Sequence, residues 1–271
     1  MTIFDDQHLK VFINEVYENH GYDFIGYSHA SFKRRLERVY QMGGFVNFHE
    51  FLYKVKTDAD YLTYVIEEIT VNVTEMFRDP YLYKVLRGEI LPSLRSKPFI
   101  RIWHAGCSTG QEVYSMAILL SEEGILSKSL IYATDLNATV LETAKKGLFP
   151  LSLMKEYGEN YRNSGGKKDF SEYYTANYGF AKFDEALSKK MVFSQHNLVS
   201  DSSFNEFDLI LCRNVMIYFD TELQSRALHL FDDSLARLGY LVLGTKETLK
   251  FTDLRKSYEQ LRKEKIWKKI N

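Results

Sequence analysis

The chain has 271 residues, and 45% of them are hydrophobic, which is enough to bury a full core in one large domain or two smaller ones. Its net charge is −1, so no overall positive charge points to bulk nucleic-acid binding. The N-terminus has no signal-peptide pattern, and no apolar run approaches the roughly 18 residues that a membrane span needs. We therefore expect a cytoplasmic protein that neither binds nucleic acid nor inserts into a membrane.

The two cysteines, Cys107 and Cys212, each lie in an apolar, strand-like run. Two buried thiols argue against a disulfide framework and for a reducing compartment. The histidines, including His104 and His196, show no recurring metal-ligand spacing, so core or surface roles are expected for them and no metal site is predicted.

Residues 1–75 show helical periodicity. Apolar residues recur at three-to-four spacing between breaks that contain Gly, Asn or Asp. The pattern predicts a small all-α N-terminal domain.

From Phe99 onwards, short apolar runs alternate with helical stretches. Five runs have strand length: 99–106, 130–135, 191–198, 207–214 and 239–245. Strands alternating with helices predict parallel pairing with crossover helices, which is a doubly wound α/β sheet. We assign residues 76–271 to this second domain. The alternation breaks over 148–192, a Tyr-rich and Gly-containing region that we interpret as an inserted subdomain.

Gly106 and Gly110 lie on the turn between the strand 99–106 and the following helix. Ligands of open α/β sheets bind at such carboxyl ends, and glycine lets the backbone approach a ligand closely. The turn could also be a plain structural corner, and it lacks the GxGxxG spacing of a nicotinamide site. Glu112, at the start of the helix, could accept from a ligand's ammonium group or simply face the helix dipole.

Asp135 ends the next strand. An acidic residue about 20 to 25 positions after the glycine turn is placed to accept hydrogen bonds from a ribose diol. It could also cap the following helix. Turn and aspartate together favour a nucleoside cofactor, and both NAD and S-adenosylmethionine fit them.

Further motifs discriminate between these cofactors. In chain order they cover residues 72–80 (NVTEMFRDP), 104–112 (HAGCSTGQE), 132–137 (YATDLN), 196–198 (HNL), 209–219 (LILCRNVMIYF) and 241–247 (LVLGTKE). From about Tyr27 to the C-terminus this series resembles the CheR-type chemoreceptor glutamate O-methyltransferases. The resemblance implies a Rossmann-like class I methyltransferase domain with a small inserted β-subdomain, preceded by an all-α domain.

The resemblance also implies S-adenosylmethionine as cofactor, with S-adenosylhomocysteine as product. Asn197 and Leu198 would line the adenine, and Tyr218 would stand near the transferable methyl group. The first turn (HAGCSTG) and the late motif (GTKE, where many relatives have GHSE) depart from the family pattern. These departures affect the expected shape of the substrate cleft more than the expected binding of the cofactor. The implied cofactor-binding residues are Asn72, Thr74, Arg78, Ala105, Gly106, Glu112, Asp135, Asn197, Leu198, Arg213 and Asn214, and the implied catalytic residues are Arg78 and Tyr218.

The chemistry of such a reaction suits these residues. A glutamate side chain is ionised near pH 7, since its unperturbed pKa is about 4.3, so methyl transfer to it needs positioning and electrostatics rather than a general base. The guanidinium of Arg78 could donate two parallel hydrogen bonds to a carboxylate, or it could form a structural contact between the domains. Tyr218 could direct its hydroxyl or its ring toward the reacting groups, or could serve packing.

A basic run in the N-terminal domain suggests where a protein substrate docks. Lys33, Arg34, Arg35 and Arg38 lie within little more than one helical turn, and Arg34 or Arg35 shares a face with Arg38. The run could be a solvated face. The resemblance favours docking of an acidic, glutamate-bearing helix of a methyl-accepting chemoreceptor or a related signalling protein, with the enzyme acting as a monomer.

Three alternatives to a chemoreceptor glutamate methyltransferase remain open from the sequence. A nicotinamide-dependent oxidoreductase is disfavoured by the missing GxGxxG fingerprint. An S-adenosylmethionine-binding adaptor without turnover is disfavoured by the presence of both Arg78 and Tyr218. A methyltransferase for a signalling protein outside chemotaxis is the third alternative, since some members of the family it resembles work in other signalling pathways.

Overall fold

The computed structural model describes residues 4–70, 74–261 and 265–271. The chain forms two compact units. The helical unit comprises Met1–Asn72 and Met216–Ala227, and the sheet unit comprises Val73–Val215 and Leu228–Asn271. Within the described ranges, no helix has both the length and the apolar character needed to cross a membrane.

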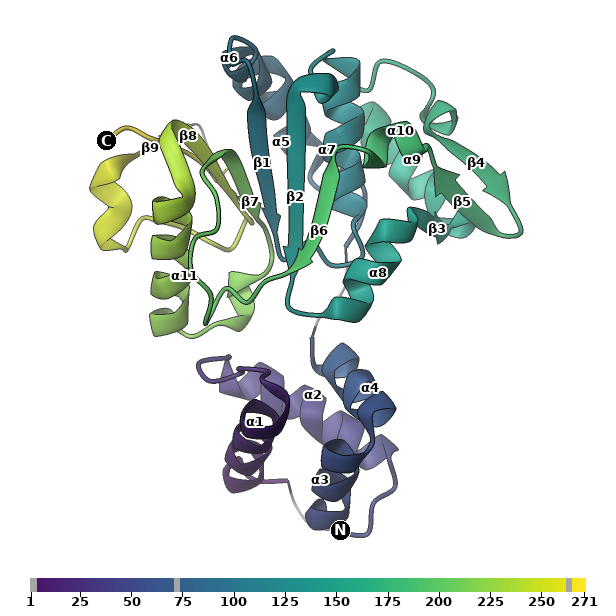
Figure 1. Cartoon of the computed structure of the whole chain (residues 1–271), viewed down its shortest axis with the longest axis vertical. Coiled ribbons are helices and arrows are strands. Elements are labelled where there is room, and N and C mark those ends of the chain that lie inside the picture. The colour runs from purple at the N-terminus through teal and green to yellow at the C-terminus, as the bar shows by residue number, and fades with distance from the viewer. Residues whose placement is uncertain (1–3, 71–73, 262–264) are drawn as a thin grey trace. The chain divides into compact units, whose positions relative to one another are not determined.

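The helical unit is built from short helices (Figure 1), each of which buries an apolar face. Its helices are α1 (Asp6–His20), α2 (His29–Met42), α3 (Phe48–Thr57), α4 (Ala59–Ile69), the short 3-10 helix η5 (Met216–Tyr218) and the first turns of α11 (Thr221–Ser234). Caps define their ends: Asp5 accepts from the backbone N–H of His8 at the start of α1, and Gly21 ends that helix at φ 73°. Aromatic side chains fill the core, where the Phe12 ring stacks on Phe51 with centroids 5.9 Å apart.

Residues Met216–Ala227, which are far along the chain from the first four helices, fold as part of the helical unit. Tyr27 and Phe219 form an antiparallel bridge, and their rings lie 5.1 Å apart. Next to this bridge, the backbone N–H of Asp220 donates to the Gly26 carbonyl over 2.7 Å. Residues far apart in sequence therefore share one small core.

The sheet unit contains a seven-stranded mixed sheet of order β6-β2-β1-β7-β8-β10-β9 (Figure 1). Its strands are β1 (Ile100–Ala105), β2 (Ser129–Asp135), β6 (Met191–Gln195), β7 (Phe207–Cys212), β8 (Leu235–Leu243), β9 (Tyr258–Leu261) and β10 (Ile266–Lys269). The five neighbouring strands β6, β2, β1, β7 and β8 pair in parallel. The strand β10 pairs antiparallel with both β8 and β9. The predicted α/β fold is confirmed, and the antiparallel edge is an addition that the alternation of strands and helices did not indicate.

Helices precede the first strand of the large sheet and lie between its later strands in the sequence. They are α5 (Pro80–Val85), the π-helix η1 (Leu86–Ile90), α6 (Leu91–Leu94), α7 (Gln111–Glu122), η2 (Leu126–Lys128), α8 (Ala138–Lys146), the later turns of α11, and η6 (Asp253–Ser257). The helix α7 follows β1 directly and buries nearly its whole length, from Val113 to Leu120. This burial fixes the turn between β1 and α7, which the sequence marked as a ligand site.

A second, smaller sheet lies between α8 and β6 in the sequence. It is antiparallel with the order β3-β5-β4, and Figure 1 shows it set apart from the large sheet. The region contains β3 (Leu148–Pro150), η3 (Leu151–Leu153), α9 (Met154–Asn163), η4 (Phe170–Tyr173), β4 (Tyr174–Asn177), β5 (Phe180–Phe183) and α10 (Glu185–Ser188).

Glu122, at the end of α7, ties this small sheet region to the main body of the unit. Its side chain is 1% exposed. Its carboxylate accepts hydrogen bonds from the hydroxyls of Tyr161 (2.5 Å) and Tyr173 (3.0 Å), from the backbone N–H of Lys167 (2.7 Å) and from Arg87 Nη2 (2.6 Å). One buried carboxylate thus accepts from four residues, which lie in η1, α9, η4 and the loop between α9 and η4.

We expect Glu122→Ala to lower the free energy of unfolding by about 3 kcal/mol, because it removes the acceptor of Arg87 Nη2 and of two buried hydroxyls, while Arg87 Nη1 keeps its pair with Glu123. Urea unfolding measures the change. Glu142→Ala is the control, since Glu142 forms an exposed pair with Lys145 within one helix, and its removal should change stability by less than about 0.5 kcal/mol. Equal losses in both variants would contradict the role given to Glu122.

Candidate functional site

The turn after β1 requires glycine at two positions. Gly106 has φ +76°, and a Cβ there would lie 2.4 Å from Cγ2 of Val215. Gly110 has φ +93°, and its Cβ would lie 2.8 Å from the Cβ of Ala144. Any side chain at either position would clash and strain the backbone. The turn therefore brings bare backbone, beginning at the buried Ala105, to the carboxyl end of the sheet.

Asp135 stands at the end of β2, beside this turn. Its Oδ2 accepts from the backbone N–H of Ser108 (2.8 Å) and its Oδ1 from that of Asn137 (3.0 Å). Burial raises the pKa of Asp135, although these backbone donors oppose the rise. The N-cap of α8 is Asn137, whose side chain accepts from the Thr139 N–H, so the helix-capping interpretation of Asp135 is wrong. Each carboxylate oxygen is oriented by the backbone and keeps a lone pair for a ligand hydroxyl.

Glu112 begins α7 and is held by two side chains. Its Oε1 lies 3.0 Å from His104 Nδ1, and its Oε2 accepts from Arg213 Nη1 over 2.6 Å. Burial alone would raise the pKa of Glu112, but Arg213 and then His104 outweigh it and lower the pKa to about 2. Glu112 is therefore a fixed negative charge at the carboxyl end of β1, suited to an ammonium group.

Arg213 follows β7, and its side chain is 3% exposed. One Nη group donates to Glu112, and the other forms an ion pair with Asp79 just before α5. Because both ends of its fork are used, Arg213 fixes two carboxylates and does not present a free fork to a ligand. Asp79 lies outside the set predicted from the sequence, although it sits within the motif 72–80.

The segment before α5 carries Arg78 and Thr74. Its buried Phe77 anchors it, because the Phe77 N–H donates to Ser115 Oγ over 3.0 Å. Arg78 Nε lies 3.8 Å from Glu75 Oε1, and its side chain is 35% exposed, so its guanidinium is only loosely engaged. Thr74 is half-buried. Asn72, which the resemblance assigns to the cofactor, lies outside the described residues.

Asn197 and Leu198 follow β6. Leu198 is buried at 7% exposure, and the Asn197 side-chain oxygen accepts from the Val199 N–H over 2.9 Å. The Asn197 N–H in turn donates to Asp201 Oδ2 over 2.8 Å. The pair therefore belongs to a rigid turn that offers an apolar side chain and a half-buried amide.

Asn214 follows Arg213 with φ 60° and is held by Glu247. The Glu247 carboxylate accepts from the backbone N–H groups of Asn214 (3.2 Å), Val215 (3.0 Å) and Gly244 (2.5 Å). Glu247 thus connects the loops after β7 and β8. It was not among the residues predicted from the sequence, and the available signal was an acidic residue four positions after the strand β8.

Buried polar atoms around β1 and β2 lack partners among the described residues. They are His104 Nε2, Ser108 Oγ and Asn137 Nδ2. Unpaired buried polar atoms are rare in proteins, and they mark places where a ligand or water completes the hydrogen bonding. These atoms are donors or acceptors that a polar ligand or water at the ends of β1 and β2 would satisfy. No group of His, Cys, Asp and Glu suited to a metal ion occurs in the described part of the chain.

The predicted residues of the helical unit separate into three environments. Lys33 Nζ pairs with Asp6 Oδ1 over 2.7 Å, so its charge is engaged. Arg34 and Arg38 are exposed, one helical turn apart. Arg35 is half-buried, and its Cζ lies 5.1 Å from the ring centre of Tyr218.

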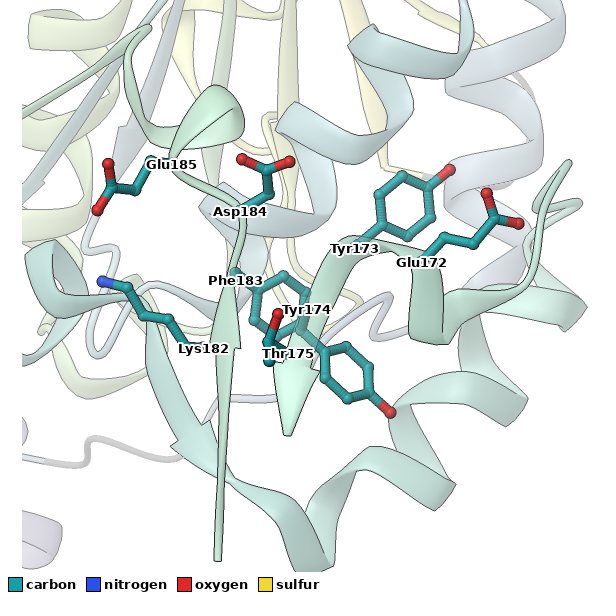
Figure 2. Close-up of a pocket in the computed structure, with 8 residues that line it drawn as sticks. All are labelled: Glu172, Tyr173, Tyr174, Thr175, Lys182, Phe183, Asp184 and Glu185. Carbon is teal, nitrogen blue, oxygen red and sulfur yellow. The ribbon is translucent and has the colours of Figure 1, made fainter. Parts of the chain in front are cut away.

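A pocket of about 260 Å³ opens on the small sheet, where β4 and β5 pair (Figure 2). The residues lining it are Glu172, Tyr173, Tyr174, Thr175, Lys182, Phe183, Asp184 and Glu185. None of these belongs to the predicted cofactor set, and all of them come from the inserted region. The pocket is therefore separate from the strand ends that carry Glu112 and Asp135.

The shifted pKa of Glu112 gives a pH test. The pKa of Glu112 in the folded protein is about 2, below the ordinary value of 4.5. The ion pairs of Arg213 with Glu112 and Asp79 therefore stabilise the fold above about pH 4.5, and this stabilisation is lost as the pH falls toward 2. We expect Glu112→Gln to be less stable than the wild type at pH 7, with a difference that narrows from pH 5 to pH 3 in urea unfolding. A difference that stays constant over this range would contradict the assignment. Glu142→Gln controls for the loss of one exposed carboxylate.

Comparison with known proteins places the chain in a family. Residues 72–265 match the family described as "CheR methyltransferase, SAM binding domain", and residues 7–70 match its all-alpha domain. The chain is 44% identical to the putative methyltransferase Cher3 of Pseudomonas putida over 265 residues, and this alignment covers 97% of each protein. It is 33% identical over 231 residues to the chemotaxis protein methyltransferase of Listeria innocua (84% of this chain, 85% of that one). It is also 32% identical over 261 residues to the chemotaxis protein methyltransferase of Borreliella burgdorferi, with 89% of this chain and 88% of that one covered. The chain therefore belongs to the CheR family of chemotaxis methyltransferases, and its cofactor is S-adenosylmethionine.

Proposed function

We propose that this chain transfers a methyl group from S-adenosylmethionine to glutamate side-chain carboxylates of a methyl-accepting chemoreceptor or a related helical signalling protein. The observation that carries the proposal is the pair of carboxylates at the ends of β1 and β2, one held ionised by Arg213 and the other presented by two backbone N–H groups. Family membership supplies the methyl donor, and these two acids match the two polar ends of that donor.

The proposed cofactor cradle uses the sheet unit's own residues. Asp135 accepts from the ribose hydroxyls, and Glu112 accepts from the ammonium group. Ala105 and Gly106 give the backbone close approach, and Leu198 packs on the adenine while Asn197 borders it. Arg213 and Asn214 belong to the cradle through the loop after β7, and Arg213 acts by orienting Glu112. Thr74 and Arg78, with Asn72, bind the amino-acid end.

The proposed chemistry depends on positioning rather than on a base. When bound, S-adenosylmethionine supplies an electrophilic methyl group on a sulfonium. A substrate glutamate is ionised at neutral pH, so it attacks without prior deprotonation. Arg78, whose guanidinium is loosely engaged, holds a carboxylate through a forked donor pair. Tyr218 directs its phenol toward the reacting groups. Both residues lower the barrier by alignment and electrostatics.

The substrate is proposed to dock on α2. Arg34 and Arg38 are exposed on one face of this helix, whereas Lys33 is paired with Asp6. An acidic helix bearing target glutamates complements two adjacent exposed guanidinium groups. The chain is proposed to work as a monomer.

A transfer assay tests the proposal. Tritiated S-adenosylmethionine is incubated with the full chain and cytoplasmic fragments of chemoreceptors from the same cell, and label is followed on glutamate. Base-labile label on glutamate supports the proposal. Cofactor binding without transfer to any fragment would contradict the proposal, and would instead support a signalling adaptor or a methyltransferase whose substrate lies outside chemotaxis.

We expect the double variant Arg34→Ala and Arg38→Ala to raise KM for the receptor fragment by about tenfold, because two exposed charges contribute on the order of 1–2 kcal/mol to docking. Steady-state methylation at low and moderate salt measures the change, and the wild-type advantage should shrink as salt rises. The control is Lys10→Ala on α1, which removes one exposed charge elsewhere on the helical unit. An unchanged KM in the double variant would exclude α2 as the docking face.

A further inference from the structure

Arg35 and Tyr218 contact each other inside the helical unit. Arg35 comes from α2 and Tyr218 from η5, and the guanidinium carbon lies 5.1 Å from the centre of the phenol ring. This distance is within the range of a cation–π interaction. The sequence motifs predicted separate roles for the two residues, docking for Arg35 and methyl transfer for Tyr218, and the contact connects them.

The surroundings of Arg35 do not suit a docking residue. The residue is half-buried, its Nη1 donates to Ser31 Oγ over 2.8 Å, and its Nε is buried without a hydrogen-bond partner among the described residues. Burial lowers the pKa of Arg35, and the neighbouring Tyr218 opposes this change. Arginine stays protonated in proteins, so a partly desolvated cation faces the ring, where cation–π attraction is stronger than in water. The neighbours Arg34 and Arg38 are exposed instead.

The backbone of Tyr218 is fixed on both sides. Its carbonyl accepts from the Ser28 N–H over 2.7 Å, and the next residue, Phe219, bridges to Tyr27. Gln224 Nε2 donates to the carbonyls of Met216 (3.1 Å) and Phe219 (3.0 Å). With the main chain held, the remaining freedom of Tyr218 is the rotation of its side chain. The Tyr218 hydroxyl makes no hydrogen bond within the described residues, so the guanidinium over the ring is the polar contact that restricts this rotation.

We propose that Arg35 is a positioning residue for Tyr218, which holds the phenol ring in one orientation for methyl transfer, and that docking on α2 falls to Arg34 and Arg38. The proposal rests on the proposed function, in which Tyr218 acts at the reacting groups. A ring held in one rotamer needs no reordering when the reaction occurs, so loss of the cation slows turnover without weakening the binding of the receptor. The same helix thus carries a binding face and a support for the catalytic phenol.

A double-mutant cycle tests the proposal with the full chain, S-adenosylmethionine and a receptor cytoplasmic fragment. The variants are Arg35→Gln, Tyr218→Ala and the two combined, and kcat and KM for the receptor fragment are measured for each. We expect Arg35→Gln to lower kcat about tenfold with KM within about twofold of the wild type, and to have no further effect in the Tyr218→Ala background. Arg35→Lys should recover part of kcat, because it keeps a cation over the ring.

Two further variants make the readout specific. Arg38→Gln is the matched docking variant on the same helix, and it should raise KM and add fully to the effect of Tyr218→Ala. Tyr218→Phe keeps the ring, so the Arg35–ring contact remains and Arg35→Gln should still lower kcat in that background. If circular dichroism shows that Arg35→Gln unfolds the chain, Arg35→Met replaces it, since methionine fills a similar volume without a charge.

The outcomes distinguish the positioning role from the proposed function. If Tyr218→Ala loses activity but Arg35→Gln lowers it further in the double variant, Arg35 acts independently of Tyr218, and the inference is wrong while the proposed function stands. If Arg35→Gln raises KM and leaves kcat unchanged, Arg35 is a docking residue and the inference is also wrong. If Tyr218→Ala retains full kcat, the role of Tyr218 in the proposed function fails, and the positioning role fails with it.

Discussion

A buried guanidinium between two carboxylates holds the candidate site of this methyltransferase together. Arg213 pairs with Glu112 at the start of α7 and with Asp79 before α5, and its own side chain is almost wholly removed from solvent. A buried charge without partners is strongly destabilising, so the array persists only when all its members are in place. The end of β7, the turn after β1 and the segment that carries Arg78 are therefore fixed by one another. The array is thus part of the fold of the sheet unit itself.

Local patterns were sufficient to predict much of this arrangement. The five apolar runs became parallel strands, and since the carboxyl ends of parallel strands meet at one edge, Glu112 and Asp135 could be placed beside each other from sequence. Gly106 was also recognisable as a glycine on a strand-to-helix turn, and the structure adds that a Cβ there would clash with Val215. These inferences needed only residue type, spacing and the expectation of parallel strands.

Other features depend on contacts between residues distant in sequence, and no local pattern reports them. Arg213 was assigned to the cofactor, but both Nη groups of its guanidinium are paired with carboxylates, those of Glu112 and Asp79. Only the fold brings these two acids together. His104, expected in a core or surface role, lies 3.0 Å from Glu112 and helps to keep it ionised. The four basic residues of α2 look alike in sequence, yet Arg35 differs from its neighbours in contacting Tyr218, which the return of Met216–Ala227 brings to the helical unit.

The proposed function depends above all on Glu112, which is held ionised by Arg213 and is proposed to bind the ammonium group of S-adenosylmethionine. Calorimetric titration of S-adenosylmethionine into the wild type and Glu112→Gln at pH 7 measures this contact, with circular dichroism to show that both proteins remain folded. A charge-assisted hydrogen bond contributes about 1.5–3 kcal/mol, so we expect at least a tenfold weaker Kd in the variant. An unchanged Kd in a folded Glu112→Gln protein would contradict the assignment of Glu112 to the cofactor.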